Sequence, residues 1–87
     1  MPLIDEIQRA IKSDKTIFGY RESIKFIKTD TPKLIIIVKN MPDNMRNEIE
    51  QNAKVSEVKV EVFDGTSKEL GLVCGKPFPI TTITIKG

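Results

Sequence analysis

The stretch KLIIIVKN, residues 33–40, decides the fold of this chain, because it contains the longest apolar run in the sequence. The five residues from Leu34 to Val38 do not alternate with polar residues, which is typical of a strand covered on both faces. Such a strand lies inside a sheet that has helices on both sides. We therefore expect residues 34–38 to be the central strand of an α/β protein.

The segment before this strand predicts two helices separated by a short strand. Residues 3–12 and residues 20–28 repeat apolar side chains at helical spacing, so each helix should bury one stripe. Residues 16–18 predict the short strand, and Gly19 permits a sharp turn from it into the second helix. Residues 29–32 end that helix at a proline. The expected buried stripes are Leu3, Ile4, Ile7, Ala10 and Ile11, followed by Tyr20, Ile24 and Ile27.

The segment after the central strand predicts a third helix and a strand near the edge of the sheet. MRNEIEQNAKV, residues 45–55, has helical periodicity, and Asp43 or Asn44 is available as its N-cap. VKVEVF, residues 58–63, alternates, so one face of this strand should be wetter than the other. The expected buried stripe of the third helix is Met45, Ile49 and Ala53.

The C-terminal part predicts a short helix and a last strand. Thr66 and Glu69 have the spacing of a capping box, so a helix should begin there, and Gly75 can end it. PITTITIKG, residues 79–87, predicts a strand with Pro79 at its first position. The alternating order of helices and strands predicts an α/β fold, namely a three-layer α/β/α sandwich around a small four-stranded mixed sheet.

The composition is that of one globular domain spanning residues 1–87. Charged residues make up 30% of the chain and hydrophobic residues 39%, and 87 residues suffice for a single core. One cysteine and no histidine exclude an internal disulfide and leave a zinc site or a Cys-His nucleophile without its usual groups. The sequence lacks a secretory signal pattern and an apolar run long enough to span a membrane. We expect a cytoplasmic protein without metal, cofactor or membrane contact.

Positive charge is concentrated in the first half of the chain. The net charge is only +2, but residues 9–46 contain nine Lys or Arg against four Asp or Glu. Residues 47–87 contain five Lys or Arg against six acids. The distribution, more than the sum, therefore bears on whether the chain binds nucleic acid.

Three loops carry the candidate chemistry: GYRESIK (19–25), KNMPDNMR (39–46) and LGLVCGK (70–76). In an α/β sandwich, loops at the carboxyl ends of neighbouring strands meet at one edge of the sheet, where helix N-termini present free N–H groups to anions. The three loops are therefore expected to form one composite surface.

The first loop offers contacts to phosphates and bases. Arg21 can bind a phosphate or a guanine edge with two hydrogen bonds, Glu22 can accept one from a base amino group, and Lys25 can pair with a phosphate. The alternative is a helix start with ordinary solvated charges.

The second loop places Asn40, Met41 and Pro42 directly after the central strand, and Arg46 follows in the next helix. The amide of Asn40 can contact a base edge or hold the backbone of the turn. The alternative is a plain turn with a capping Asn or Asp.

The third loop has two interpretations. Leu72 and Val73 can form an exposed apolar platform for an unstacked base, with Lys76 at the adjoining phosphate and glycines that let the backbone approach RNA. Alternatively, Leu70, Val73 and Cys74 are core residues of the short helix. The thiol is then inert, because no histidine or second cysteine is present to activate it.

In this order and spacing, the three motifs resemble the L-seven-Ae kink-turn RNA-binding family, and within it the archaeal and eukaryotic L-thirty-e branch of large-subunit ribosomal proteins. The similarity covers roughly residues 3–85. It implies an α/β/α sandwich that binds a kink-turn, which is an RNA helix bent sharply by a bulge and followed by tandem sheared G·A pairs.

The resemblance also implies which residues touch RNA. The first loop would lie along the backbone and the G·A pairs, the second beside it, and the third on the bulge nucleotides. The implied RNA-binding residues are Gly19, Tyr20, Arg21, Glu22 and Lys25, then Asn40, Met41, Pro42 and Arg46, then Leu72, Val73, Cys74, Gly75 and Lys76.

The sequence departs from the family pattern in three places. Residues 50–53, EQNA, stand where relatives often have Glu-Tyr-Tyr-Ala, so an aromatic packing element is absent. Many members continue into an acidic tail beyond the position of Gly87. Arg21 stands where L-seven-Ae-type relatives carry Asn, which favours the ribosomal branch.

We therefore expect a non-enzymatic RNA-binding protein of the large ribosomal subunit, monomeric when free. Its expected partners are kink-turn RNA, most simply ribosomal RNA, and neighbouring ribosomal proteins, but not DNA. Two alternatives keep the fold: a stand-alone kink-turn binder acting in a guide-RNA particle or on messenger RNA, and a protein-interaction module that has lost RNA binding. A small thiol enzyme that uses Cys74 is the remaining alternative.

Overall fold

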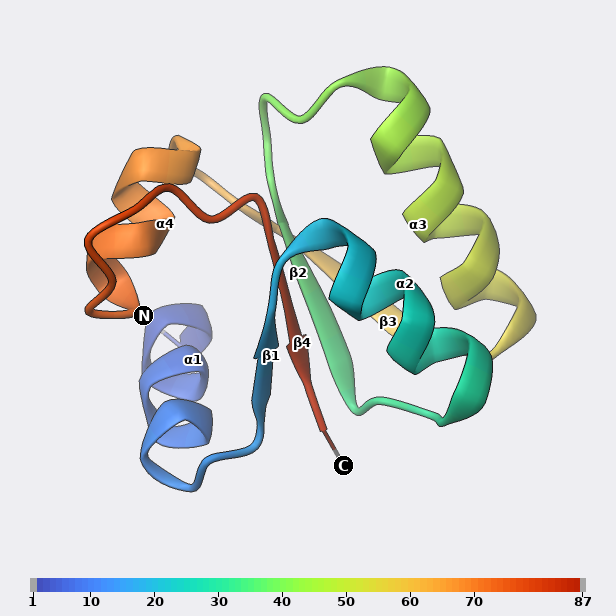
Figure 1. Ribbon diagram of the computed structural model, residues 1–87, viewed down its shortest axis with the longest axis horizontal. Helices are drawn as coiled ribbons and strands as arrows, with labels where there is room; N and C mark the ends of the chain where they lie inside the picture. The colour runs from blue at the N-terminus through green and yellow to red at the C-terminus, as the bar shows by residue number, and fades with distance from the viewer. Residues whose placement is uncertain (1, 87) are drawn as a thin grey trace.

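The computed structural model describes residues 2–86, in which helices and strands alternate strictly (Figure 1). This is the predicted order of elements, and Thr66 and Glu69 form the predicted capping box at the start of the last helix. The elements are α1 Pro2–Lys12, β1 Thr16–Phe18, α2 Tyr20–Thr29, β2 Leu34–Val38, α3 Asp43–Val55, β3 Lys59–Phe63, α4 Ser67–Val73 and β4 Thr82–Ile85.

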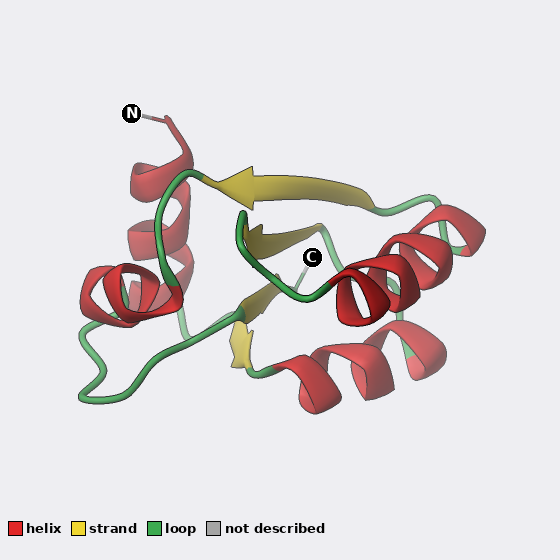
Figure 2. Ribbon diagram, turned by 90° about the horizontal axis from the view of Figure 1, so that it is seen from above, coloured by secondary structure: helices red, strands yellow, loops and turns green. Residues whose placement is uncertain are grey.

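The four strands form one mixed sheet in the order β1-β4-β2-β3. β2 pairs with β3 in parallel and with β4 in antiparallel orientation, and β1 pairs with β4 in antiparallel orientation. The strand β2 is therefore interior and β3 lies at an edge, as predicted. Helices α1 and α4 cover one face of the sheet, and α2 and α3 cover the other, which confirms the three-layer α/β/α sandwich (Figures 1 and 2).

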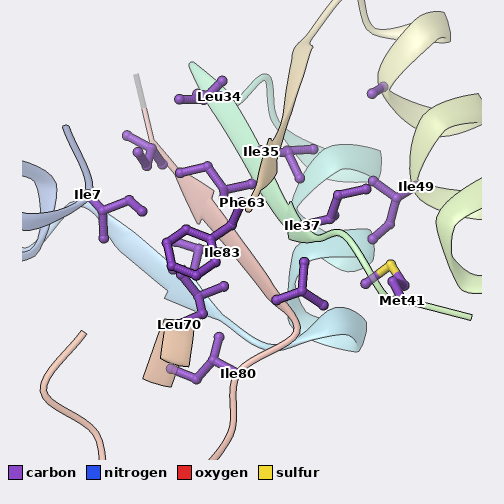
Figure 3. Close-up of a cluster of buried hydrophobic side chains, with 14 of the residues drawn as sticks. Ile7, Leu34, Ile35, Ile37, Met41, Ile49, Phe63, Leu70, Ile80 and Ile83 are labelled. Carbon is purple, nitrogen blue, oxygen red and sulfur yellow. The ribbon is translucent and has the colours of Figure 1, made fainter. Parts of the chain in front are cut away.

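The core fills both spaces between the sheet and its helices (Figure 3). Every residue of β2 is buried, because this strand has neighbours on both edges and helices on both faces. On one face Ile83 packs near Ile7 of α1 and Leu70 of α4, and on the other Ile35 and Ile37 of β2 lie near Ile49 of α3 (Figure 3). The continuous apolar run in the sequence is explained by this double coverage.

Two predicted boundaries were wrong. The last strand begins at Thr82 and not at Pro79, because the preceding segment follows α4 and the Ile80 amide donates to the Ser67 carbonyl at 3.0 Å. The N-cap of α3 is Pro42, whose carbonyl accepts from the Arg46 amide at 3.0 Å. Asp43 is instead the first helical residue, and no side chain caps this helix.

Two side chains are more exposed than their patterns predicted. Ile4 lies on the expected apolar stripe of α1 but is 36% exposed, and Val62 of β3 is 45% exposed. Both lie beside the outer edge of the sheet, where no further strand covers them. The rest of the predicted stripes is at least half-buried, except Leu3, whose side chain lies outside the described part. No helix within residues 2–86 combines the length and hydropathy of a membrane span.

Candidate nucleic-acid interface

The structure brings the first two candidate loops to one edge of the sheet, at the top of Figure 1, whereas residues 70–76 form the second half of α4 and its exit below that edge. The loop after β1, the turn after β2 and the end of the connection from α4 to β4 lie at the edge. Two hydrogen bonds near this edge tie neighbouring segments together: the Gly19 amide donates to the Thr82 carbonyl at 2.9 Å, and the Val38 amide donates to the Thr81 carbonyl at 3.1 Å. The first two loops therefore adjoin each other through β4, and the third approaches them through Lys76, whose Nζ lies 4.8 Å from the ring centroid of Phe18. One composite surface of all three loops stays a prediction.

The N-terminus of α2 is open at this edge. Gly19 has φ 106° and ψ 151°, a conformation that essentially only glycine adopts, and it turns the chain directly from β1 into the helix. No side chain caps the first turn, so the free N–H groups and the positive end of the helix dipole face outward. Arg21, Glu22 and Lys25 are exposed here, and neither cation forms an ion pair within residues 2–86.

Tyr20 anchors the start of α2 to α3. Its hydroxyl donates a hydrogen bond to the Glu48 carboxylate, which lies 28 positions away in the sequence. This hydrogen bond, with help from burial and the negative charge of Glu48, raises the pKa of Tyr20 to about 12. The phenol is therefore neutral at physiological pH and holds two helices in place.

The turn after β2 exposes only part of its predicted site. Asn40 and Pro42 are exposed, whereas the Met41 side chain is only 4% exposed and packs in the core. Arg46 is half-buried, and its Nη2 donates to the Lys39 carbonyl at 2.9 Å. Met41 can offer only its backbone to a ligand, and Arg46 shapes the turn as well as adding charge.

The third loop combines both interpretations of its sequence. Leu72 is 69% exposed, Val73 is half-buried against the core, and Cys74 is only 7% exposed. Burial raises the pKa of the Cys74 thiol to about 11, although the positive charge of Lys76 acts in the opposite direction. The thiol is therefore protonated and inert at neutral pH, and the apolar platform consists mainly of Leu72.

The two glycines of the third loop differ in role. Gly75 is exposed at φ 71° and ends α4, as predicted. Gly71 is buried, and a Cβ there would clash with the Phe78 carbonyl. The close backbone approach at Gly71 is thus internal to the protein, and only Gly75 is free to approach a ligand.

Two residues that sequence reasoning missed support this edge. Glu48 holds Tyr20, and the ring of Phe18 lies under Lys76, whose Nζ is 4.8 Å from the ring centroid. Both contacts join residues far apart in the chain, so no local spacing pointed to them. Within the described range, no group of three or more His, Cys, Asp or Glu is placed to hold a metal ion. The predicted site residues that are at least partly accessible are Gly19, Tyr20, Arg21, Glu22, Lys25, Asn40, Pro42, Arg46, Leu72, Val73, Gly75 and Lys76.

Known proteins similar to this chain include large-subunit ribosomal proteins. The chain is 41% identical over 75 residues to the large ribosomal subunit protein eL30 of Candida albicans, covering 86% of this chain and 71% of that protein. It is 39% identical to eL30 of Methanosphaera stadtmanae and 35% identical to that of Sulfurisphaera tokodaii, each over 92% of this chain. The alignments cover 82% and 76% of those two proteins.

Two solved structures share the fold at low sequence identity. A 15.5 kD RNA-binding protein of Giardia lamblia superposes with a TM-score of 0.87 over 98% of this chain and 71% of its own, at 17% identity. A Bacillus halodurans protein of unknown function superposes with a TM-score of 0.85 over 97% of this chain and 83% of its own, at 15% identity. These two likenesses establish the architecture alone.

A family model also matches nearly the whole chain, residues 2–87. Its description is that of a ribosomal protein family, which agrees with the sequence expectation of a structural protein and not an enzyme. The chain belongs to the ribosomal protein L7Ae/L30e/S12e/Gadd45 family.

Proposed function

We propose that residues 1–87 form one RNA-binding domain, which serves as a structural protein of the large ribosomal subunit and recognises a kink-turn in ribosomal RNA. Family membership and the eL30 relatives support the ribosomal and RNA-binding role. The observation that carries the proposal is the three-loop edge, where the uncapped start of α2 exposes Arg21 and Lys25 without ion-pair partners in the described chain.

Phosphate contacts would position the RNA on this edge. Arg21 and Lys25 lie one helical turn apart on the exposed side of α2, so they can follow consecutive phosphates along one strand. The free N–H groups at the start of α2 add fixed partial charge beside them. Lys76 supplies a further charge from the third loop, where its contact with Phe18 limits its range of movement.

Base contacts would distinguish a kinked RNA from a straight one. Glu22 and Asn40 are exposed at the same edge. The Glu22 carboxylate can accept from a base amino group, and the Asn40 amide can donate to or accept from a base edge that the kink exposes. Leu72 projects an exposed apolar side chain against which an unstacked base can pack. A straight duplex offers neither feature, so the edge favours a sharply bent RNA.

Fluorescence anisotropy with a labelled kink-turn and a straight duplex of equal length tests this proposal. The kink-turn should bind at least about tenfold more tightly, and log Kd should vary with log salt with a slope magnitude of roughly 3 to 4 if about four phosphates are neutralised. Lys25→Ala should weaken binding several-fold and reduce the slope by about 1, whereas the matched control Lys54→Ala, exposed near the end of α3, should change neither.

Two results would contradict the proposal. Equal affinity for the two RNAs would show that the protein binds polyanions without recognising the kink. An affinity that does not depend on salt would show that the protein makes no phosphate contacts. If the unmodified protein bound neither RNA, that result would favour the alternative of a protein-interaction module.

The place of action is tested separately. We infer a cytoplasmic protein that is monomeric when free and otherwise bound to ribosomes. Sucrose-gradient sedimentation in high salt should keep the protein with large subunits. Recovery only in smaller particles would favour a stand-alone kink-turn binder instead.

A further inference from the structure

The outer edge of the sheet carries a second surface with a chemistry opposite to that of the RNA edge. β3 is one of the two edge strands, and within residues 2–86 only β2 pairs with it (Figure 2). A groove of about 760 Å³ runs beside it, between β3, the start of α1 and α4. Its lining residues are Ile4, Glu61, Val62, Phe63, Asp64, Glu69, Leu72 and Val73.

The groove exposes two apolar side chains from different helices. Ile4 of α1 and Leu72 of α4 are 36% and 69% exposed and line it together. Val62 borders the groove at the edge of β3, but its pairing with Ile37 turns its side chain, 45% exposed, towards the face of α2 and α3. Exposed apolar side chains that gather in one hollow mark a binding surface, whereas scattered ones carry no such meaning.

The charge of the groove identifies the kind of partner. Glu61, Asp64 and Glu69 line it, and none of its described lining residues is Lys or Arg. Glu61 and Asp64 each contact a lysine at 3.1 Å, but both lysines are more than half exposed, so the ion pairs are screened by solvent and hold the carboxylates weakly. An RNA phosphate would be repelled here, whereas a basic peptide would be attracted.

The backbone of β3 supplies the remaining interaction. The Phe63 carbonyl points inward, since it accepts from the Lys39 amide beside β2 at 3.2 Å. Amide groups of successive strand residues point to alternate sides, so those of Val60 and Val62 point to the open edge. These are unpaired donors and acceptors for an added strand.

We propose that β3 and its groove bind an extended protein segment, which adds to the sheet as a fifth strand and places apolar side chains in the groove and basic ones on its acidic rim. Leu72 lines this groove and is also a predicted RNA contact, so the bound segment would adjoin bound RNA. The inference goes beyond RNA recognition and does not depend on it.

The test is an NMR titration of the ¹⁵N-labelled chain with a heptapeptide in which lysine and valine alternate. Saturable shifts should be confined to β3, α4 and the first turn of α1, and hydrogen exchange of the Val60 and Val62 amides should slow on binding. The same peptide with glutamate in place of lysine should bind at least about tenfold more weakly, because it meets three carboxylates.

Two substitutions localise the site. Val62→Pro removes an outward N–H from an edge position that tolerates proline. This variant should bind the peptide at least about tenfold more weakly, and its affinity for kink-turn RNA should be unchanged. Ile4→Ser serves as the second variant if Val62→Pro fails to fold. It should lower the affinity for the peptide about fivefold. Its control is Val55→Ser, at a site 86% exposed and outside the groove, which should have no effect.

Several results would overturn the proposal: an absence of saturable shifts in β3, equal binding of the acidic peptide, or no response to either substitution. Concentration-dependent shifts in the chain alone would assign the edge to a second copy of this chain. Shifts of the β3 residues and of the first turn of α1 by RNA would assign it to nucleic acid. Either assignment would refute a basic protein segment as the occupant.

Discussion

At the scale of single residues, the contact between Tyr20 and Glu48 fixes how α2 presents its N-terminus. Tyr20 is the only tyrosine and the chain has no tryptophan, so absorbance near 295 nm reports this one side chain. Because the carboxylate stabilises the neutral phenol, the pKa of Tyr20 is raised from 10.0 to about 12.

We predict that this pKa depends on Glu48. At pH 11, about one tenth of Tyr20 should be ionised in the unmodified protein, whereas Glu48→Gln should bring the pKa towards 10.0 and ionise most of the population. The folded state holds the phenol proton more tightly than the unfolded chain, so this contribution to stability is complete below pH 10 and lost as the pH approaches about 12. Circular dichroism must show that both proteins are folded at pH 11. Indistinguishable titration curves would refute the role of Glu48.

Gly71 permits the tight packing of the segment before β4 on α4. Gly71→Ala should lower the free energy of unfolding by about 1–3 kcal/mol, because a Cβ would clash with the Phe78 carbonyl. Urea denaturation measures the change. Lys68→Ala, at an exposed site in the same helix, should alter stability by no more than about 0.5 kcal/mol, and an equal effect at both sites would argue against the clash.

Neither contact could be predicted from the sequence. Tyr20 and Glu48 stand 28 positions apart, and the neighbour of Gly71 lies across a loop, so neither follows helical or strand periodicity. The sequence did predict that Arg21 and Lys25 are exposed, because charged side chains at the start of a surface helix stay in contact with solvent. It left the state of Cys74 open until burial decided it.

At the scale of elements, β4 carries polar side chains into the core. Thr82 and Thr84 are fully buried, and their hydroxyls lack a hydrogen-bond partner among the described residues. They pair with Ile37 and Ile35 of β2, so they stand on the face covered by α2 and α3. A buried hydroxyl without a partner costs stability.

Thr84→Val should therefore raise the free energy of unfolding by roughly 1 kcal/mol, since valine has nearly the same shape and no hydroxyl to desolvate. Ile83→Val, the neighbouring position on the opposite face, should lower it by about 0.5–1.5 kcal/mol through lost packing. Chemical denaturation compares the two variants with the parent. A clear loss of stability in Thr84→Val would show that the hydroxyl is satisfied in solution.

The type and order of every element were predictable, but two ends were not. The buried run in β2 and the capping box of α4 are local signals that tertiary structure reinforces. The start of β4 depends on whether residues 79–81 follow the sheet or α4, and the cap of α3 depends on which carbonyl accepts the first helical bond. The first is settled by a contact between segments, from the Ile80 amide to the Ser67 carbonyl, and the second by the bond from the Arg46 amide to the Pro42 carbonyl within the helix.

At the scale of the whole molecule, the strand order determines where function can lie. Because β4 sits between β1 and β2, the loop entering it reaches the same edge as the loops leaving its two neighbours. The meeting of the loops after β1 and β2 was predictable from a general property of α/β sheets, whereas the position of residues 70–76 was not, because they continue α4. The groove beside β3 was not predictable either, because it depends on how far α1 and α4 extend over an edge strand.

A second basic region surrounds a different hollow, and RNA binding there can be compared with RNA binding at the three-loop edge. Lys15, Lys33 and Lys86 line a hollow of about 220 Å³ together with Arg9 of α1, and none of these side chains forms an ion pair within residues 2–86. If RNA bound only through net positive charge, this region would attract it as well as the three-loop edge does. Mapping the bound surface therefore separates specific recognition from general electrostatic attraction.

Ultraviolet crosslinking to RNA in the native complex, with mapping of both the peptide and the nucleotide, tests the central claim most directly. We expect crosslinks from residues 19–25, 39–46 and 70–76 to nucleotides at a sharp bend in large-subunit ribosomal RNA. Crosslinks concentrated at Arg9, Lys33 and Lys86, or mapped to an unbent helix, would contradict it.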